Sequence, residues 1–215
     1  MAKKANPRYS LTLFSLIFII WSFYRYFPEF LPVWFEELIL KPALWLLPTF
    51  WLVLIVEKQS LFSLGFTRKN LSKALYWGFG LGLIFLVEGF LMNILKYRGL
   101  QIVLPSLNSL SGSLWLSLAP AFTEETVFRG YFFTRFFRFW HEEIWANLAS
   151  SFLFTLIHLP VAVFVLSYAP AMLFIYLFLI FIFAFSSAFV FARTQNLLAS
   201  ILLHLFWSWP IVLFK

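Results

Sequence analysis

Long apolar runs recur along this chain and are separated by short polar connections. They lie at about residues 11–24, 42–56, 74–95, 113–134, 144–166, 170–192 and 197–214. Most of them approach the roughly 20 residues that an α-helix needs to cross a bilayer. They are too long and too unbroken for the alternating strands of a membrane β-barrel. The pattern predicts an all-α fold, a polytopic transmembrane helical bundle of about seven spans, with six to eight as the range.

The connections between the runs set the predicted boundaries. Aromatic residues follow the first run and no small-residue cleavage site does, so we predict an uncleaved first span. Residues 28–41, which hold three glutamates, are predicted to lie at the interface, with the second span beginning after them. No repeat or long linker divides the chain. This predicts a single transmembrane domain over residues 1–215, with a motif-bearing core at about 113–214.

Composition agrees with a membrane protein and removes several kinds of site. Hydrophobic residues make up 62% of the chain and charged residues 12%, against about 25% charged in soluble domains. Cysteine is absent, which excludes thiolate metal sites, iron–sulfur clusters and a cysteine nucleophile. The net charge of +7 is carried mostly by short loops, so it indicates contact with anionic headgroups and not with nucleic acid.

The distribution of Lys and Arg predicts the orientation. With a cytoplasmic N-terminus, ten basic residues fall inside: Lys3, Lys4, Arg8, Lys58, Arg68, Lys69, Lys73, Arg135, Arg138 and Arg193. Five fall outside: Arg25, Lys41, Lys96, Arg98 and Lys215. Cytoplasmic loops carry the excess of positive charge. We therefore predict an integral protein of the plasma (inner) membrane, with its N-terminus in the cytoplasm and, after seven spans, its C-terminus outside.

A few ionisable residues interrupt the apolar runs, and each costs roughly 2.5–3.5 kcal/mol at bilayer depth on insertion scales. Such costs are tolerated where a residue has a function or a partner. The candidates, in chain order, are Glu88, Glu124, Glu125, Arg129, His158 and His204, with Ser208 one turn after the last.

The run at 113–134 carries two adjacent glutamates. Glu125 and Arg129 are four residues apart, so on a helix they share a face and can neutralise each other. Glu124 points about 100° away and has Phe128 at the i+4 position, so we expect its carboxylate to be unpaired and suited to general acid–base work. The alternative is that both acids and the arginine form one structural clamp between helices.

Two histidines lie on later spans. His158 stands two residues before Pro160, which is expected to break or bend the helix, and His204 lies in the last run. If both meet Glu124, two chemistries fit. The glutamate and one histidine polarise a water while the other histidine donates to an oxyanion, or all three bind a divalent metal such as zinc that activates the water.

These residues resemble the motifs of the CPBP family of intramembrane proteases, which includes the CAAX prenyl endopeptidases and the bacterial Abi proteins. The motif Glu-Glu-x-x-x-Arg is matched by Glu124, Glu125 and Arg129. Phe-x-x-x-His is matched by Phe154 and His158. His-x-x-x-Asn is matched by His204, but Ser208 stands where asparagine is usual. The segment 64–68 is similar to the family's early cytoplasmic connection.

The resemblance implies a glutamate-type endopeptidase whose active-site cavity lies within the membrane. Glu124 and His158 would activate the attacking water, and His204 with Ser208 would stabilise the oxyanion. Glu125 and Arg129 would support the site. The resemblance implies no cofactor, with a divalent metal held by Glu124, His158 and His204 as the alternative. The implied partners are the bilayer and a membrane-embedded or lipid-modified peptide substrate.

Serine at position 208 keeps other functions open. Its hydroxyl is shorter than an asparagine amide, and loss of one oxyanion donor costs about 10²–10³ in rate. The alternative function is a non-catalytic member of the same scaffold, of the binding or bacteriocin-immunity type. A proton-relaying transporter that uses Glu88 and Glu124 is a third reading, which the lack of an internal repeat does not favour.

Overall fold

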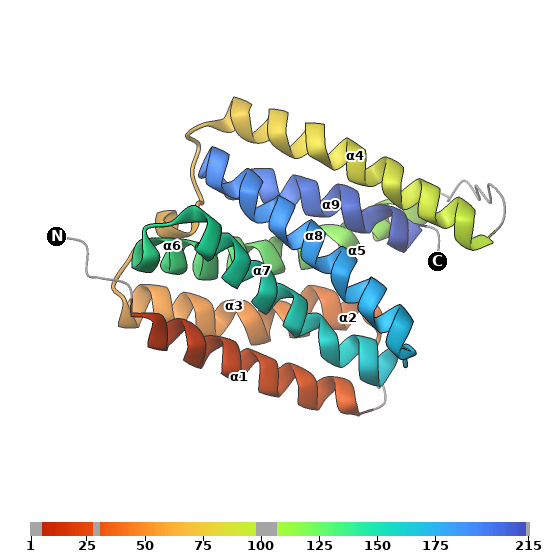
Figure 1. Ribbon diagram of the computed structural model, residues 1–215, viewed down its shortest axis with the longest axis horizontal. Coiled ribbons are helices and arrows are strands. Elements are labelled where there is room, and N and C mark those ends of the chain that lie inside the picture. The colour runs from red at the N-terminus through yellow and green to blue at the C-terminus, as the bar shows by residue number, and fades with distance from the viewer. Residues whose placement is uncertain (1–5, 28–30, 98–106, 214–215) are drawn as a thin grey trace.

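The chain folds into a bundle of long helices (Figure 1), and the computed structural model describes residues 6–27, 31–97 and 107–213. No strand occurs in these three ranges. The elements in chain order are α1 (Pro7–Tyr26), α2 (Val33–Phe35), η1 (Glu36–Leu40), α3 (Lys41–Trp51), η2 (Leu52–Val56), η3 (Leu61–Leu64), α4 (Leu71–Tyr97), α5 (Leu107–Glu125), η4 (Thr126–Phe133), α6 (Thr134–Trp140), α7 (Glu143–Pro160), η5 (Val161–Val165), α8 (Pro170–Thr194) and α9 (Leu197–Leu213).

Several of these elements join end to end into longer helices. The segments α2 to η2, α5 to α6, and α7 to η5 each follow one another without a break, with π-helical turns inside them. Each predicted span therefore corresponds to one helix or one joined helix. Successive helices run in alternating directions across the bundle, as Figure 1 shows.

The predicted helical membrane bundle is confirmed. Within the described residues, four helices are long and apolar enough to cross a bilayer: Val33–Val56, Leu71–Leu91, Glu143–Val165 and Pro170–Thr194. The last helix is a shorter apolar segment, Leu197–Pro210. The total of about seven spans remains a prediction, as do the charges at Lys3, Lys4, Glu29, Arg98 and Lys215, which lie outside the described residues.

The boundary predicted for the second span is wrong. The helix begins at Val33, well inside the stretch predicted to lie at the interface. Glu36 and Lys41 are consequently buried in the bundle and not exposed at its rim. The bundle tolerates them because each has an oppositely charged partner: Glu36 pairs with Arg25, and Lys41 bridges two glutamates.

The helix that carries His158 does not end at Pro160, as a break there would require. It continues through η5 to Val165 as a π-helical turn. Pro48 likewise lies inside α3, which continues past it. Prolines are tolerated in membrane helices because neighbouring groups and local π-helical adjustments satisfy the freed backbone atoms.

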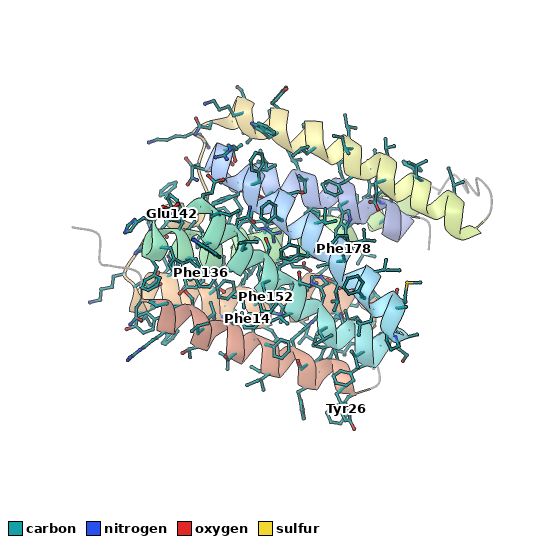
Figure 2. All side chains as sticks on the ribbon, in the orientation of Figure 1. Phe14, Tyr26, Phe136, Glu142, Phe152 and Phe178 are labelled. Atoms are coloured by element: carbon teal, nitrogen blue, oxygen red, sulfur yellow. The ribbon has the colours of Figure 1, made fainter. Side chains whose placement is uncertain are left out.

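Aromatic side chains fill the interior and also cover the outside. Phe14 and Phe136 are buried, whereas Tyr26 and Phe178 are more than half exposed (Figure 2). Large exposed apolar surfaces are unusual on a soluble monomer. On a bundle of membrane-spanning helices they are the surface that faces lipid.

The connection before α4 is hydrogen-bonded to the start of α9. A turn and a helix start occur at Thr67–Asn70: the Lys69 amide donates to Thr67 Oγ1 (3.1 Å), and the Asn70 carbonyl accepts from the Ala74 amide (2.8 Å). Asn196 reaches the same connection, donating to the Thr67 and Lys69 carbonyls. This links the start of α9 to the loop between the second and third long helices.

Candidate active site

Three helices bring the predicted trio together in the interior. Glu124 lies at the end of α5, His158 on α7 and His204 on α9. The Glu124 Oε2 atom is 3.8 Å from His158 Nε2 and 4.0 Å from His204 Nε2. These separations are too long for direct hydrogen bonds. The predicted convergence is therefore present, while the chemical roles of the three residues stay predictions.

Glu124 is not unpaired, which corrects the expectation from the helix spacing. Its Oε1 atom lies 2.5 Å from the Lys41 ammonium, which the neighbouring helix α3 contributes. Lys41 also donates to Glu37 Oε2 at 3.1 Å. The second carboxylate oxygen of Glu124, Oε2, is buried without a hydrogen-bond partner among the described residues. The two oxygens are thus distinct: one is held by a cation and the other faces two imidazoles.

The ion pair predicted between Glu125 and Arg129 is confirmed, with Arg129 Nε 3.1 Å from Glu125 Oε2. Glu125 also accepts from Ser187 on α8 (2.7 Å) and contacts His204 Nδ1 through Oε1 (2.8 Å). Arg129 donates in turn to the Ala184 carbonyl at 3.0 Å. Glu125 therefore orients the imidazole that faces Glu124.

These contacts decide which ring nitrogens carry protons. His158 Nδ1 lies 2.8 Å from the Phe154 carbonyl, and a carbonyl only accepts, so this nitrogen carries the hydrogen. The same argument places a hydrogen on His204 Nδ1, which faces the Glu125 carboxylate. In either neutral imidazole the Nε2 atom is then a lone-pair acceptor directed toward Glu124 Oε2.

Aromatic rings surround the trio and exclude most solvent. Phe154 lies 4.7 Å from the His158 ring and 6.1 Å from the His204 ring, and the Arg129 guanidinium stands over it at 4.5 Å. Phe183 contacts the His204 ring at 4.8 Å. The side chain of His158 is 16% exposed, against 5% for Glu124 and 4% for His204. Access to the trio is therefore from the His158 side.

Two further predicted residues, Ser208 and Glu88, lie in different surroundings. Ser208 lies one turn beyond His204 on α9, and its buried Oγ has no hydrogen-bond partner in the described part of the chain. Glu88 lies on α4 and forms no ion pair with these residues across the described ranges. Glu88, which the transporter reading assigns to a proton relay, is therefore not part of the group formed by Glu124, His158 and His204.

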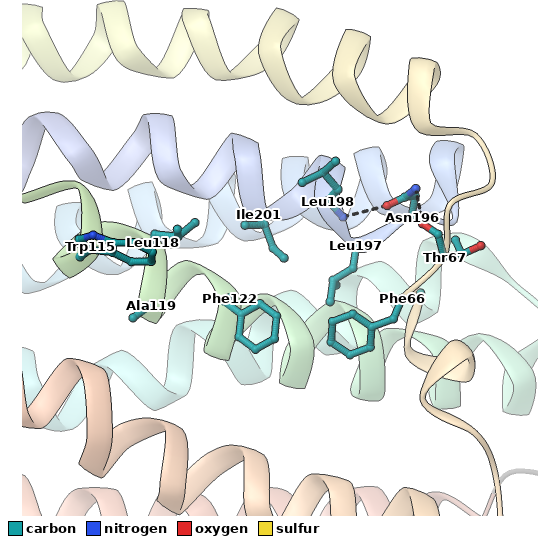
Figure 3. Close-up of a pocket in the computed structure, with 11 residues that line it drawn as sticks. Phe66, Thr67, Trp115, Leu118, Ala119, Phe122, Asn196, Leu197, Leu198 and Ile201 are labelled. Atoms are coloured by element: carbon teal, nitrogen blue, oxygen red, sulfur yellow. Dashed lines mark hydrogen bonds between the residues drawn. The ribbon is translucent and has the colours of Figure 1, made fainter. Parts of the chain in front are cut away.

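Two pockets of the structure lie away from the trio. An apolar pocket of about 550 Å³ lies between α5, the start of α9 and residues 65–67, as Figure 3 shows. A second pocket, of about 590 Å³, lies beside Lys69 and Arg138. Neither is lined by Glu124, His158 or His204. A cavity around these three residues stays a prediction.

The trio does not fit a metal ion as it is arranged. No group of three His, Asp or Glu side chains in the described ranges has the geometry of a metal site. Zinc ligands at about 2.0–2.2 Å from the ion lie roughly 3.3 Å from one another in a tetrahedron, whereas Glu124 Oε2 is 3.8 and 4.0 Å from the two imidazole nitrogens. The Lys41 ammonium already supplies a positive charge to the carboxylate.

Sequence reasoning missed Lys41, which was assigned to an outer loop. A signal for its location existed: Glu37 and Lys41 are four residues apart, acid before base, which is the spacing of a helical ion pair. That spacing indicates that the helix begins before Lys41. Ser187 carried no comparable signal, because single serines are common in membrane helices.

The comparisons with known proteins point to one family. Residues 106–210 match the family model described as type II CAAX prenyl endopeptidase Rce1-like. This range contains the trio, Glu125, Arg129 and Ser208. No curated protein and no solved structure matched the chain.

Proposed function

Since residues 106–210 place this chain in the CPBP family of CAAX-type proteases, we propose that it is an intramembrane endopeptidase that uses Glu124 and His158 to activate water. Its substrate is a peptide that is embedded in the bilayer or carries a lipid. The observation that supports this most is the environment of Glu124 Oε2, a buried carboxylate oxygen that faces two imidazole nitrogens and has no hydrogen-bond partner among the described residues.

A water bound between these groups would be oriented for attack. It donates one hydrogen to Glu124 Oε2 and the other to the lone pair of His158 Nε2. As its oxygen bonds to the scissile carbonyl carbon, the first proton passes to Glu124 and the carbonyl oxygen becomes an oxyanion. When the intermediate collapses, the C–N bond breaks and Glu124 returns the proton to the leaving amine. The products are a carboxylic acid and an amine.

His204 would stabilise the oxyanion, and this role has a requirement. Because Nδ1–H is directed at Glu125, His204 can donate from Nε2 only when the ring is doubly protonated. Glu124 and Glu125 flank the ring and would stabilise that imidazolium. Preorganised donors of this kind supply a large part of the rate enhancement in acyl transfer.

The second candidate is a non-catalytic protein that binds a peptide on the same scaffold. Ser208 favours it, because serine replaces the usual asparagine of the family motif and its hydroxyl contacts no polar partner in the described ranges. The two candidates differ in whether a bond is cut. A cleavage assay separates them.

The assay uses the purified full-length chain in proteoliposomes with a farnesylated CAAX peptide, and a co-expressed membrane reporter as a second substrate. We expect cleavage by the wild type and a loss of at least about 10²-fold for Glu124→Ala and for His158→Ala, since general acid–base groups contribute about 10²–10⁴. Glu88→Ala is the matched control, an intramembrane carboxylate outside the cluster, and should cleave normally. If wild type, Glu124→Ala and His158→Ala cleave alike, the protease proposal is wrong.

Metal dependence is tested in the same assay. Because the trio does not match a zinc geometry, we expect a chelator to leave the rate unchanged. Activity that is lost with the chelator and restored by added zinc would assign Glu124, His158 and His204 to a metal instead of a water-activating pair.

A further inference from the structure

A buried lysine from outside the family-matched residues completes the surroundings of Glu124. Lys41 is only 7% exposed, and its ammonium contacts the carboxylates of Glu124 at 2.5 Å and Glu37 at 3.1 Å. The rings of Trp45 and Trp21 lie 5.3 and 5.6 Å from the same nitrogen. The ammonium is thus held on several sides by groups that favour a cation.

The local helix geometry explains how Lys41 reaches this position. It follows directly after η1, a π-helical turn, and its backbone N–H bonds to the Glu36 carbonyl five residues earlier. A π-turn inserts an extra residue into the helix and changes the direction in which later side chains point, and such turns are frequent at functional sites. Here the turn ends at the residue whose side chain enters the cluster.

The contact selects between the two oxygens of Glu124. Lys41 engages Oε1, and Oε2 is left facing His158 and His204. Without the ammonium, the carboxylate would be free to rotate or to turn toward Arg129, and neither oxygen would be fixed against the imidazoles. A displacement of a catalytic group by about 1 Å can cost 10²-fold in rate.

We propose that Lys41 is a positioning residue of the active site, holding Glu124 Oε1 so that Oε2 faces the two imidazoles. This inference rests on the proposed protease function. It also gives the N-terminal part of the chain, which lies outside residues 106–210, a direct role in the site.

The test measures kcat and KM per folded protein in proteoliposomes with the farnesylated CAAX peptide. Lys41→Met should lower kcat about 10²-fold and leave KM unchanged, because Lys41 contacts the carboxylate and not the substrate. Lys41→Arg keeps the charge with a different shape and should show a smaller loss of kcat. Arg25→Met is the matched control: Arg25 is equally buried and paired with Glu36, but it does not contact Glu124.

The outcomes distinguish a failure of the proposed protease function from a failure of the proposed role of Lys41. If wild type and Glu124→Ala cleave alike, the proposed function itself fails. If Glu124→Ala is inactive but Lys41→Met has the wild-type kcat, or loses no more than Arg25→Met, only the role of Lys41 is overturned. Should Lys41→Met not fold, Lys41→Gln takes its place, because its amide is polar but carries no charge to hold the Glu124 carboxylate. A lower kcat at unchanged KM supports the role, and a loss no larger than that of Arg25→Met refutes it.

Discussion

The buried charges around Glu124 form a set that is one positive charge short. Three carboxylates, those of Glu37, Glu124 and Glu125, face two cations, Lys41 and Arg129. Unbalanced charge is costly in a low-dielectric interior. The His204 ring lies beside two of these carboxylates, with Nδ1 2.8 Å from Glu125 Oε1 and Nε2 4.0 Å from Glu124 Oε2.

The role of position 208 can be tested by restoring the family's usual residue. Ser208→Asn should raise the cleavage rate, up to about 10²-fold, because an amide reaches further than a hydroxyl and supplies an oxyanion donor. Ser208→Ala should change the rate little, since the serine Oγ has no hydrogen-bond partner among the described residues.

The measurement is kcat for both variants against wild type, with folding checked by thermal unfolding in detergent. A Ser208→Asn variant that folds and cleaves no faster than Ser208→Ala would show that this position takes no part in oxyanion binding.

Helix spacing predicted the ion pair within one helix and missed the ion pair between Lys41 and Glu124, which lie on different helices. The pairing of Glu125 with Arg129 was predicted correctly because the two residues are four apart on one face of a helix. Glu124 was taken as unpaired because its cation, Lys41, is distant in the chain and belongs to a helix whose start was placed too late. Spacing carries no information about which residue of another helix will face a side chain.

Among the elements, π-helical turns lie next to the charged residues. The turn η1 precedes Lys41, η4 follows Glu125, and η5 follows the helix that carries His158. Sequence periodicity predicts the helices but not these turns. A π-helical turn adds one residue, and the hydrophobic spacing before it and after it is that of an ordinary helix. The directions of the side chains in the site therefore could not be derived from an ideal helix.

Close packing of η4 against the connection before α4 makes a specific prediction for Gly130. A Cβ at this position would lie 2.8 Å from the Leu64 carbonyl oxygen, a backbone atom that cannot easily move. Gly130→Ala should destabilise the fold by roughly 1–3 kcal/mol, the usual cost of overpacking. The readout is the midpoint of thermal unfolding in detergent.

Gly80→Ala is the control for this prediction. Position 80 also lies in a long helix, but nothing is within 4 Å of an added Cβ. The substitution should therefore leave the midpoint unchanged or raise it slightly, because alanine has the higher helix propensity. Equal midpoints for Gly130→Ala and Gly80→Ala would mean that η4 does not need the close approach to Leu64.

For the whole molecule, hydrophobic patterning was sufficient to predict a helical membrane bundle, and each predicted span corresponds to a helix. The predicted starts were less accurate where charged residues lie inside the bundle, because a helix containing Glu36 and Lys41 looks like an interfacial segment until its partners are known. Patterning measures affinity for lipid, whereas paired charges are stabilised by contacts that no single segment contains.

The orientation of the bundle in the membrane is a prediction that thiol labelling can test. The starts of α4 and α8 lie at opposite ends of the bundle (Figure 1). Lys69 precedes α4 and Ala169 precedes α8, and both side chains are exposed. Because the chain has no cysteine, Lys69→Cys and Ala169→Cys each introduce a single thiol without any prior change. The excess of basic residues at the Lys69 end predicts that this end is cytoplasmic.

A membrane-impermeant maleimide added to intact cells should label Ala169→Cys at once and Lys69→Cys only after the cells are opened. The wild type, which has no thiol, gives the background. The reverse pattern would place the N-terminus outside and would show that the basic loops do not set the topology. In that case the end of the bundle where Lys69 meets the start of α9, the helix that carries His204, would face the outside of the cell.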